Sequence, residues 1–389
     1  MRLWHWVAWT VVGMALVAPA QAADKFKLGY MATLSGPGGI TGTELVDGLK
    51  LALEHLGGKI GGLPTDVIIQ DDQQKPDVAR QIVEKFIISD KVDAVAGVVF
   101  SNLMLAIYGP VVKATTILVS SNAGPSEIAG KDCSPYFFST SWQGDNYAEA
   151  MGAYLQAKGV QNIYLMAPNY AAGHDVLTGF KRYFKGKIAD EVYTPLSQLD
   201  FATELAQIRA ANPTAVFVFY PGGLGIQFVK QYSQAGLKEG HPLYTAYTVD
   251  NTTLPAIGDD ALGLVTATFW NADLDNPVNK RFVADFVAAH GHLPAEQAAQ
   301  AYDTVMLLDS GVRGVHGKIE DKAAFIAALA KGEFKSARGK FRFNTNHFPI
   351  QNFYLEQVVK GADGKPRLKL GDVAMQDHGD AYAAQCPMK

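Results

Sequence analysis

Residues 92–125 read VDAVAGVVFSNLMLAIYGPVVKATTILVSSNAGP and give the clearest indication of the fold class. Its two short apolar runs, residues 92–99 and 116–119, are typical of buried strands. Between them, Ser101 stands in the N-cap position of a predicted helix over residues 102–112. Successive buried strands joined by a helix predict a parallel sheet with helices on its faces.

The same alternation extends along the rest of the chain and restarts after Trp142. Before Trp142 it also predicts strands at residues 25–32 and 66–70 and helices at residues 44–56 and 76–89. Later strands are expected at residues 162–167, 191–194, 215–220, 243–246 and 264–268, with helices at residues 147–158, 175–185, 203–211, 224–235, 276–290 and 295–312. Two successive runs of this kind predict an α/β fold with two similar lobes and parallel sheets.

The amino-terminal segment, residues 1–22, has the pattern of a secretory signal peptide. Arg2 supplies a positive charge, residues 7–17 are uncharged, and Ala20-Gln21-Ala22 is a small-x-small site for signal peptidase. The apolar run is short for a membrane span. We expect export with cleavage after Ala22, and an uncleaved amino-terminal anchor is the alternative.

Composition and missing motifs argue against several classes of function. Hydrophobic residues make up 48% of the chain and charged residues 19%, which is enough apolar material for packed cores. The net charge of −4, with mixed signs, argues against a broad nucleic-acid surface. The sequence holds no P-loop, no Gly-x-Ser-x-Gly and no His-Glu-x-x-His, so we expect no enzyme, no metal and no cofactor. A secreted enzyme with another mechanism is the alternative, although no clustered nucleophile and base suggests one.

The chain has two cysteines, Cys133 after a loop and Cys386 three residues before the end. In an oxidising compartment two such cysteines are expected to pair. A disulfide between them would pin a carboxy-terminal tail that cannot hold itself by burial. A reactive thiol is the alternative, but no basic neighbour is present to activate it.

Polar and aromatic residues gather at the carboxyl ends of the predicted strands, where open α/β sheets bind ligands. Phe100 and Ser101 follow one strand and open a helix, whose free N–H groups and dipole suit a carboxylate. Residues 120–125 follow the next strand with further hydroxyl and amide groups. The second half places four tyrosines at strand ends: Tyr170, Tyr220, Tyr244 and Tyr247. Together they predict an aromatic cleft between the lobes, while packing and N-capping are the alternative roles of each residue taken alone.

These features resemble the type I periplasmic solute-binding proteins of the leucine/isoleucine/valine-binding family, which serve ABC importers. The resemblance covers the mature chain and rests on five short motifs: GYMATLSGPG at residues 29–38, GGL at residues 61–63 before Asp71-Asp72, GVVFS at residues 97–101, YFFSTSW at residues 136–142 and QAYD at residues 300–303. It implies two Rossmann-like lobes joined by three crossovers, near residues 141–143, 268–271 and 344–350, which close on a ligand like a hinge. It also implies a periplasmic location, a small-molecule ligand, a membrane permease as partner and a monomer.

The resemblance also sets the expected domain boundaries. Lobe 1 is expected at residues 23–141 and 270–345. Lobe 2 is expected at residues 142–269 and 346–375. Residues 376–389 would form the tail that the disulfide pins.

The ligand contacts of the family carry over one at a time, and one of them is changed. The serine that holds the ligand carboxylate matches Ser101, and contacts from the next loop match Ser121 and Ala123. An aromatic wall residue matches Tyr170. The acidic residue that pairs with the ligand ammonium falls at Tyr247, whose hydroxyl cannot neutralise a buried cation. The resemblance therefore implies a site that keeps its carboxylate half and loses its ammonium half.

We therefore expect a small organic acid without an α-amino group, of the benzoate, hydroxybenzoate or hydroxycinnamate type. An aromatic-acid uptake branch of the wider family has a similar cysteine-containing tail. The expected ligand-binding residues are Phe100, Ser101, Ser121, Ala123, Trp142, Tyr170, Tyr220 and Tyr247. The two serines and the Ala123 amide would hold the carboxylate, Trp142 and two tyrosines would enclose the ring, and Tyr247 would bond a distal polar group.

Two alternatives stay open within the same fold. One is an amino acid or amide ligand whose cation pairs with Asp145 or Asp250. The other is a sensor subunit that docks on a membrane receptor instead of a permease.

Overall fold

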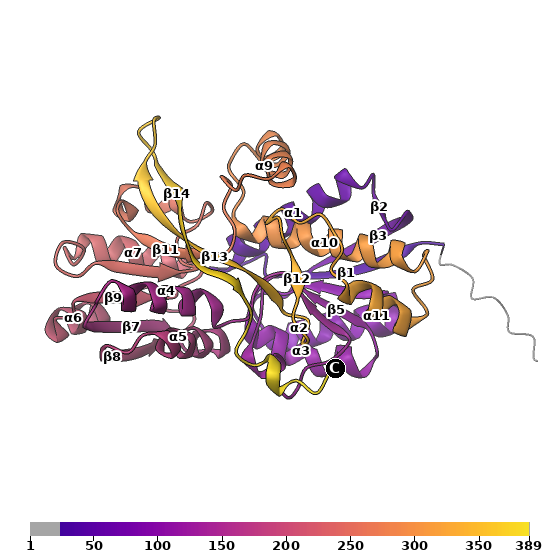
Figure 1. Cartoon of the computed structure of the whole chain (residues 1–389), viewed down its shortest axis with the longest axis horizontal. Coiled ribbons are helices and arrows are strands. Elements are labelled where there is room, and N and C mark those ends of the chain that lie inside the picture. Colours follow the sequence, from indigo (N-terminus) through magenta and orange to yellow (C-terminus); the bar gives the residue numbers. More distant parts are fainter. Residues whose placement is uncertain (1–23, 389) are drawn as a thin grey trace, which may run out of the picture.

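Short buried strands build the sheet of lobe 1, in the computed structural model that describes residues 24–388 (Figure 1). This sheet has six strands in the order β2-β3-β1-β4-β5-β6, and all of its pairs are parallel except the β2–β3 hairpin. The strands are β1 (Phe26–Ala32), β2 (Lys59–Ile60), β3 (Leu63–Asp71), β4 (Ala94–Gly97), β5 (Ile117–Ser120) and β6 (Phe137–Ser139). Every residue of β4 and β5 is buried, as expected for parallel strands that are covered on both faces.

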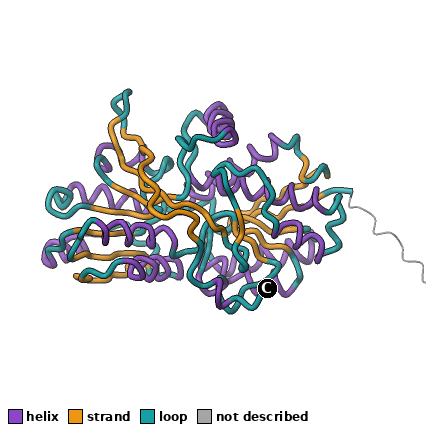
Figure 2. The backbone as a smooth tube through the Cα atoms, in the orientation of Figure 1, coloured by secondary structure: helices purple, strands orange, loops and turns teal. Residues whose placement is uncertain are grey.

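Helices lie on both sides of this sheet (Figure 2). They are α1 (Gly39–His55), α2 (Pro76–Lys85), α3 (Ser101–Lys113), α9 (Pro277–His290), α10 (Glu296–Gly314) and α11 (Lys322–Ala330). Helix α10 packs along α1, although the two are far apart in the sequence. Gly48 permits this approach, because a Cβ atom there would lie 2.1 Å from the Ala298 carbonyl oxygen.

The second sheet belongs to lobe 2 and holds the remaining described strands. Its order is β12-β13-β11-β10-β9-β7-β8, with β14 paired to β13. The strands are β7 (Asn162–Pro168), β8 (Lys187–Thr194), β9 (Ala215–Val218), β10 (Leu243–Ala246), β11 (Val265–Thr268), β12 (Arg342–Phe343), β13 (Pro349–Lys360) and β14 (Pro366–His378). Its helices are α4 (Asn146–Ala157), α5 (Ala171–Tyr183), α6 (Ala202–Ala211), α7 (Gly223–Gln234) and the short α8 (Leu254–Ile257).

The predicted fold class, two α/β lobes with largely parallel sheets, is confirmed. The alternating strands and helices of both lobes lie where the sequence predicts them, within a few residues at most ends. Two strands end two residues earlier than predicted: β9 ends at Val218, and β4 ends at Gly97 because Val98 adopts a left-handed backbone with φ of 70°. The antiparallel β13–β14 hairpin was not predicted, and its second strand runs past residue 375 into the range expected for the tail.

One buried arginine joins the three segments that connect the lobes. Arg338 donates to the carbonyl oxygens of Thr140 and Ser141 in the first crossover and to Oε1 of Gln351 in the third. Its guanidinium also lies 4.4 Å from the ring centre of Phe269, which follows β11 in the second crossover. Asp303 of α10 pairs with its Nε at 2.9 Å, so the crossovers are anchored to lobe 1.

The carboxy-terminal tail runs from the β13–β14 hairpin of lobe 2 to lobe 1 (Figure 1). The predicted disulfide is confirmed: Cys133 and Cys386 are bonded, with their Cα atoms 5.7 Å apart. Along the way, Tyr382 donates to the carboxylate of Asp145 at 2.9 Å. The tail is therefore a strap that contacts both lobes.

The expected signal peptide, residues 1–22, lies outside the residues that the structure describes. Among the helices of residues 24–388, none has the length and apolar character to cross a membrane.

Candidate ligand-binding site

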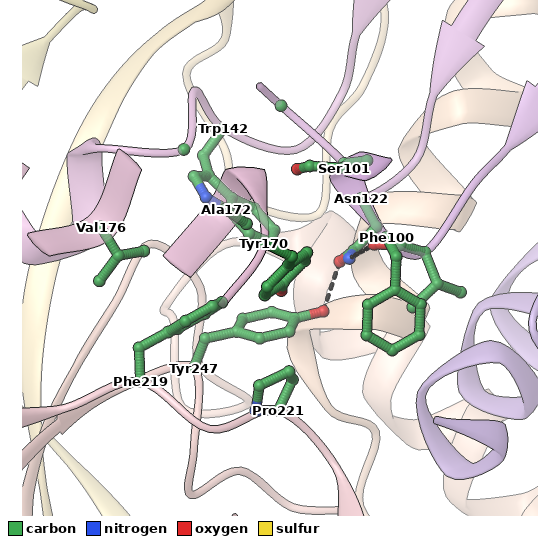
Figure 3. Close-up of a pocket in the computed structure, with 14 residues that line it drawn as sticks. Phe100, Ser101, Asn122, Trp142, Tyr170, Ala172, Val176, Phe219, Pro221 and Tyr247 are labelled. Carbon is green, nitrogen blue, oxygen red and sulfur yellow. Dashed lines mark hydrogen bonds between the residues drawn. The ribbon is translucent and has the colours of Figure 1, made fainter. Parts of the chain in front are cut away.

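A narrow cavity lies between the two lobes, at the carboxyl ends of their parallel strands (Figure 3). Its walls are Val99, Phe100, Ser101, Asn122, Ala123, Gly124, Trp142, Gly144, Tyr170, Ala172, Val176, Phe219, Pro221 and Tyr247. The volume open to the centres of water-sized molecules is about 20 Å³. Because both lobes supply walls to so small a space, the structure represents a closed arrangement of the lobes.

The strained end of β4 carries the first wall. A left-handed conformation is unfavourable for a β-branched residue such as Val98, and strain of this kind gathers at functional sites. It turns the chain so that Val99, Phe100 and Ser101 reach the cavity. Ser101 is the first residue of α3, so Phe100 occupies the N-cap position that the sequence suggested for the serine. Within the described chain the Ser101 hydroxyl makes no hydrogen bond, and the residue lines the cavity with 3% of its surface exposed.

The loop after β5 carries the second wall, and its register differs by one residue from the prediction. Asn122 and Gly124 line the cavity, and Asn122 Nδ2 donates to the Val99 carbonyl at 2.7 Å. The Ala123 amide, expected to bind the ligand, donates instead to the Val98 carbonyl at 3.1 Å. The backbone N–H groups of Asn122 and Gly124 have no acceptor among the described residues, so these amides are free for a ligand.

Aromatic side chains form the lobe 2 side of the cavity. The rings of Tyr170 and Phe219 stack at 6.4 Å, and Phe100 of lobe 1 meets Tyr170 edge-on at 6.1 Å. Trp142, at the first crossover, lies 4.8 Å from the ring of Tyr247. The Tyr247 hydroxyl donates across the cleft to Oδ1 of Asn122, as the dashed line in Figure 3 shows. These aromatic faces suit a flat apolar group, but in this arrangement of the lobes the space of about 20 Å³ between them is too small to hold a ring.

The walls of the cavity are uncharged, helix N-termini lie beside it, and the buried carboxylates of Asp175, Asp250 and Glu296 lie behind its tyrosines. None of its lining residues carries a formal charge. Four helices begin at the cavity: α3 at Ser101, α5 at Ala171, α4 two residues after Gly144 and α7 two residues after Pro221. Each helix N-terminus acts as roughly half a positive charge and offers unpaired N–H groups. Burial raises the pKa of Tyr170 and Tyr247 far above 10, so both hydroxyls are neutral donors. This arrangement suits an anion with an aromatic body.

Six of the eight predicted ligand-binding residues line the cavity, namely Phe100, Ser101, Ala123, Trp142, Tyr170 and Tyr247. Ser121 points into the core of lobe 1, where its hydroxyl bonds Tyr30 at 3.1 Å and Thr304 at 2.8 Å. Tyr220 points into the core of lobe 2 and bonds Thr194 at 3.1 Å. Successive side chains of an extended segment face opposite sides, so a register error of one residue exchanges wall and core.

The two acidic residues considered as partners for a ligand cation lie outside the cavity lining. Asp145 pairs with Arg182 at 2.6 Å. Asp250 accepts from the amides of Thr252 and Thr253 and from Nε2 of Gln297. Both carboxylates therefore serve structural contacts within the protein.

Sequence reasoning missed several walls of the cavity. Asn122 stood inside the loop that the sequence singled out, and Phe219 stood directly before a predicted site residue. Gly144, Ala172 and Val176 carry no chemical signal of their own. They reach the cavity because α4 and α5 begin beside it.

Comparison with known proteins agrees with this geometry. The model of a periplasmic binding protein family matches residues 25–365. A Leu/Ile/Val-binding protein homolog 6 of Brucella melitensis is 29% identical over 362 residues, covering 90% of this chain and 92% of the relative.

Two solved structures extend the comparison. An ABC transporter solute-binding protein of R. palustris in complex with benzoate is 31% identical, with a TM-score of 0.88 over 94% of this chain and 100% of that one. A second one, from Rhodopseudomonas palustris BisB5 with 3,4-dihydroxybenzoic acid, is 30% identical, with a TM-score of 0.84 over 91% and 99%. The chain described here therefore belongs to the periplasmic binding protein family and is a solute-binding protein of an ABC transporter.

Proposed function

We propose that this protein captures a small aromatic carboxylate, of the benzoate or hydroxybenzoate type, between its two lobes and delivers it to a membrane permease. The observation that carries the proposal is an uncharged, aromatic cavity where four helix N-termini meet. The N–H groups at helix N-termini can bind an acid, and flat apolar walls can pack against a ring.

The carboxylate would lie at the start of α3. Ser101 offers its free hydroxyl and its unpaired amide there, and Asn122 and Gly124, whose amides have no acceptor among the described residues, also line the cavity. Hydrogen bonds from several neutral donors can hold a carboxylate without a cationic side chain. The ring would then occupy the slot between Tyr170 and Trp142.

The comparisons support the aromatic acid over an amino acid. Two structures about 30% identical to this chain were solved with benzoate and with 3,4-dihydroxybenzoic acid. The Leu/Ile/Val-binding relatives favour an amino acid, but a buried ammonium needs a partner anion. The cavity lining holds no carboxylate to supply one.

A thermal denaturation panel tests the proposal. The mature protein would be melted with benzoate, 4-hydroxybenzoate, benzamide and leucine at matched concentrations. A ligand at 100 times its Kd stabilises the folded state by about 2.7 kcal/mol, which raises the melting temperature measurably. We expect stabilisation by the two acids and little by benzamide, which has the same shape without the charge. Stabilisation by leucine alone would overturn the aromatic-acid proposal.

The permease partner and the monomeric state are part of the same proposal. Loss of aromatic-acid uptake on deletion of the gene would support transport. Unchanged uptake with a lost transcriptional or motile response would favour the sensor alternative.

A further inference from the structure

A carboxylate of lobe 2 forms hydrogen bonds with lobe 1 beside the ligand cavity. Asp175, on α5 of lobe 2, accepts the backbone N–H of Ser126 at 2.9 Å and the Ser126 hydroxyl at 2.5 Å. Ser126 belongs to lobe 1, in the segment that follows β5. Asp175 is 7% exposed, and burial, with the nearby Asp145, raises its pKa to about 7. The contact is therefore a two-point hydrogen bond between the lobes that is shielded from water.

This contact replaces a local helix cap. Ser126 opens the 3₁₀ turn Ser126–Ile128, and the residue before it is Pro125, whose side chain has no acceptor. The first N–H groups of a helical turn need an acceptor from outside the turn. Asp175 supplies it from the other lobe, so the cap is complete only when the lobes are together.

The same elements carry walls of the cavity. Helix α5 begins directly after Tyr170 and presents Ala172 and Val176 to the cavity, on either side of Asp175 in the sequence. The Ser126 segment follows Asn122 and Gly124, which line the opposite side.

Gly144, a residue of the cavity wall, packs closely against Asp175 of the Ser126–Asp175 contact. The Gly144 amide donates to the Gly124 carbonyl at 2.7 Å. A Cβ atom at Gly144 would lie 2.9 Å from Oδ2 of Asp175 and 3.1 Å from the Gly124 oxygen. The Ser126–Asp175 contact and the cavity wall are therefore packed directly against each other in this arrangement of the lobes.

We propose that Ser126 and Asp175 form a closure latch that holds the lobes together over the bound ligand and sets how slowly the ligand leaves. Both are positioning residues, since neither lines the cavity. The choice of ligand in the test rests on the proposed function, whereas the latch itself rests on the contact between the lobes.

Stopped-flow fluorescence measures the latch. Trp142 in the cavity wall reports ligand entry, with benzoate and 4-hydroxybenzoate as probes. In Ser126→Ala we expect the dissociation rate to rise about 10-fold, because a shielded carboxylate loses one of its two donors, while the association rate changes less than twofold. In a protein that already carries Asp175→Ala, adding Ser126→Ala should not change the dissociation rate further. Ser134→Ala is the matched control, because that hydroxyl bonds Tyr136 within lobe 1.

Two outcomes would overturn the latch. One is a wild-type dissociation rate in Ser126→Ala. The other is an equal effect of Ser126→Ala with and without Asp175, which would mean that the serine acts elsewhere. A role only in folding would lower the melting temperature of the ligand-free protein and leave both rates unchanged.

A second measurement separates the latch from the choice of ligand. Spin labels on Lys113→Cys of lobe 1 and Lys185→Cys of lobe 2 report the distance between the lobes, and the native cysteines are paired and do not react. If neither acid shortens this distance in the wild type, the proposed function fails. If, at a subsaturating concentration of acid, the fraction of closed molecules is the same in the wild type and in Ser126→Ala, the latch proposal is wrong.

Discussion

At the scale of single residues, two serines with similar surroundings in the sequence have different roles. Ser101 is expected to bond the ligand carboxylate, whereas the Ser121 hydroxyl is already bonded to Tyr30 and Thr304. Ser101→Ala should weaken benzoate binding about 10-fold or more and leave the melting temperature unchanged, because a hydrogen bond to a charged group contributes about 1.5–3 kcal/mol. Isothermal titration and thermal denaturation measure both effects.

Ser121→Ala is the matched control for this prediction. It should lower the melting temperature through two lost buried hydrogen bonds and leave the affinity near that of the wild type. The opposite pattern, with affinity lost in Ser121→Ala and kept in Ser101→Ala, would contradict the structural assignment.

At the same scale, the positions of the predicted site residues can be compared with the cavity, while their role in ligand binding stays a prediction. Phe100, Ser101, Trp142, Tyr170 and Tyr247 were predicted and line the cavity, because each follows the end of a strand or stands at a crossover. The errors at Ser121 and Tyr220 were register errors. A sequence pattern locates the end of a strand to within a few residues, but one residue decides which side chain faces the cavity.

At the scale of elements, a buried glutamate connects α1 to the start of α10. Glu44 Oε1 accepts the N–H of Ala295, the N-cap residue of α10, at 2.6 Å. Burial raises the pKa of Glu44 to about 8. The folded protein therefore binds a proton that the unfolded chain, with a glutamate pKa of about 4.3, releases. The stability that this proton contributes is complete below about pH 4 and is lost as the pH rises to about 8.

Glu44→Gln tests this linkage, because the amide keeps an acceptor for Ala295 and does not titrate. The melting temperature of the wild type minus that of Glu44→Gln should fall as the pH rises from 5 to 8 and should level off above about 9. Glu54→Gln, at an exposed position of the same helix, is the control. A difference that is constant over this range would show that Glu44 does not take up the proton.

Among the elements, the alternating strands and helices were predictable and the carboxy-terminal hairpin was not. Strands β4 and β5 are fully buried and therefore appear in the sequence as continuous apolar runs. Strand β14 is largely exposed and carries charged residues, so its sequence shows neither an apolar run nor a clear alternation. Its pairing with β13 through a long antiparallel ladder gives it structure.

At the scale of the whole molecule, the disulfide and the strap hold distant parts together. The Cys133–Cys386 bond closes a loop with a sequence separation of 253 residues. Replacing both cysteines by serine should lower the free energy of unfolding by about 2–5 kcal/mol, because the unfolded chain gains freedom. Chemical denaturation under oxidising conditions measures this loss.

The same variant should keep the ligand affinity within about twofold, because no residue of the tail lines the cavity. An affinity that falls strongly while the stability is unchanged would mean that the strap governs lobe closure instead of stability.

The α/β fold class, the family and the pairing of the cysteines could be predicted from the sequence, as could a cavity with aromatic walls. These properties follow from local apolar runs, from the residues at strand ends and from residue types, all of which can be read directly in the sequence. The three-dimensional arrangement was needed to show which side chains face the cavity, which amides have no acceptor, and that Asp175 and Arg338 bridge distant segments. Those properties depend on how the two lobes are placed relative to each other. Side-chain orientation at strand ends and contacts between distant segments produce no periodic pattern in the sequence, so they cannot be predicted from it.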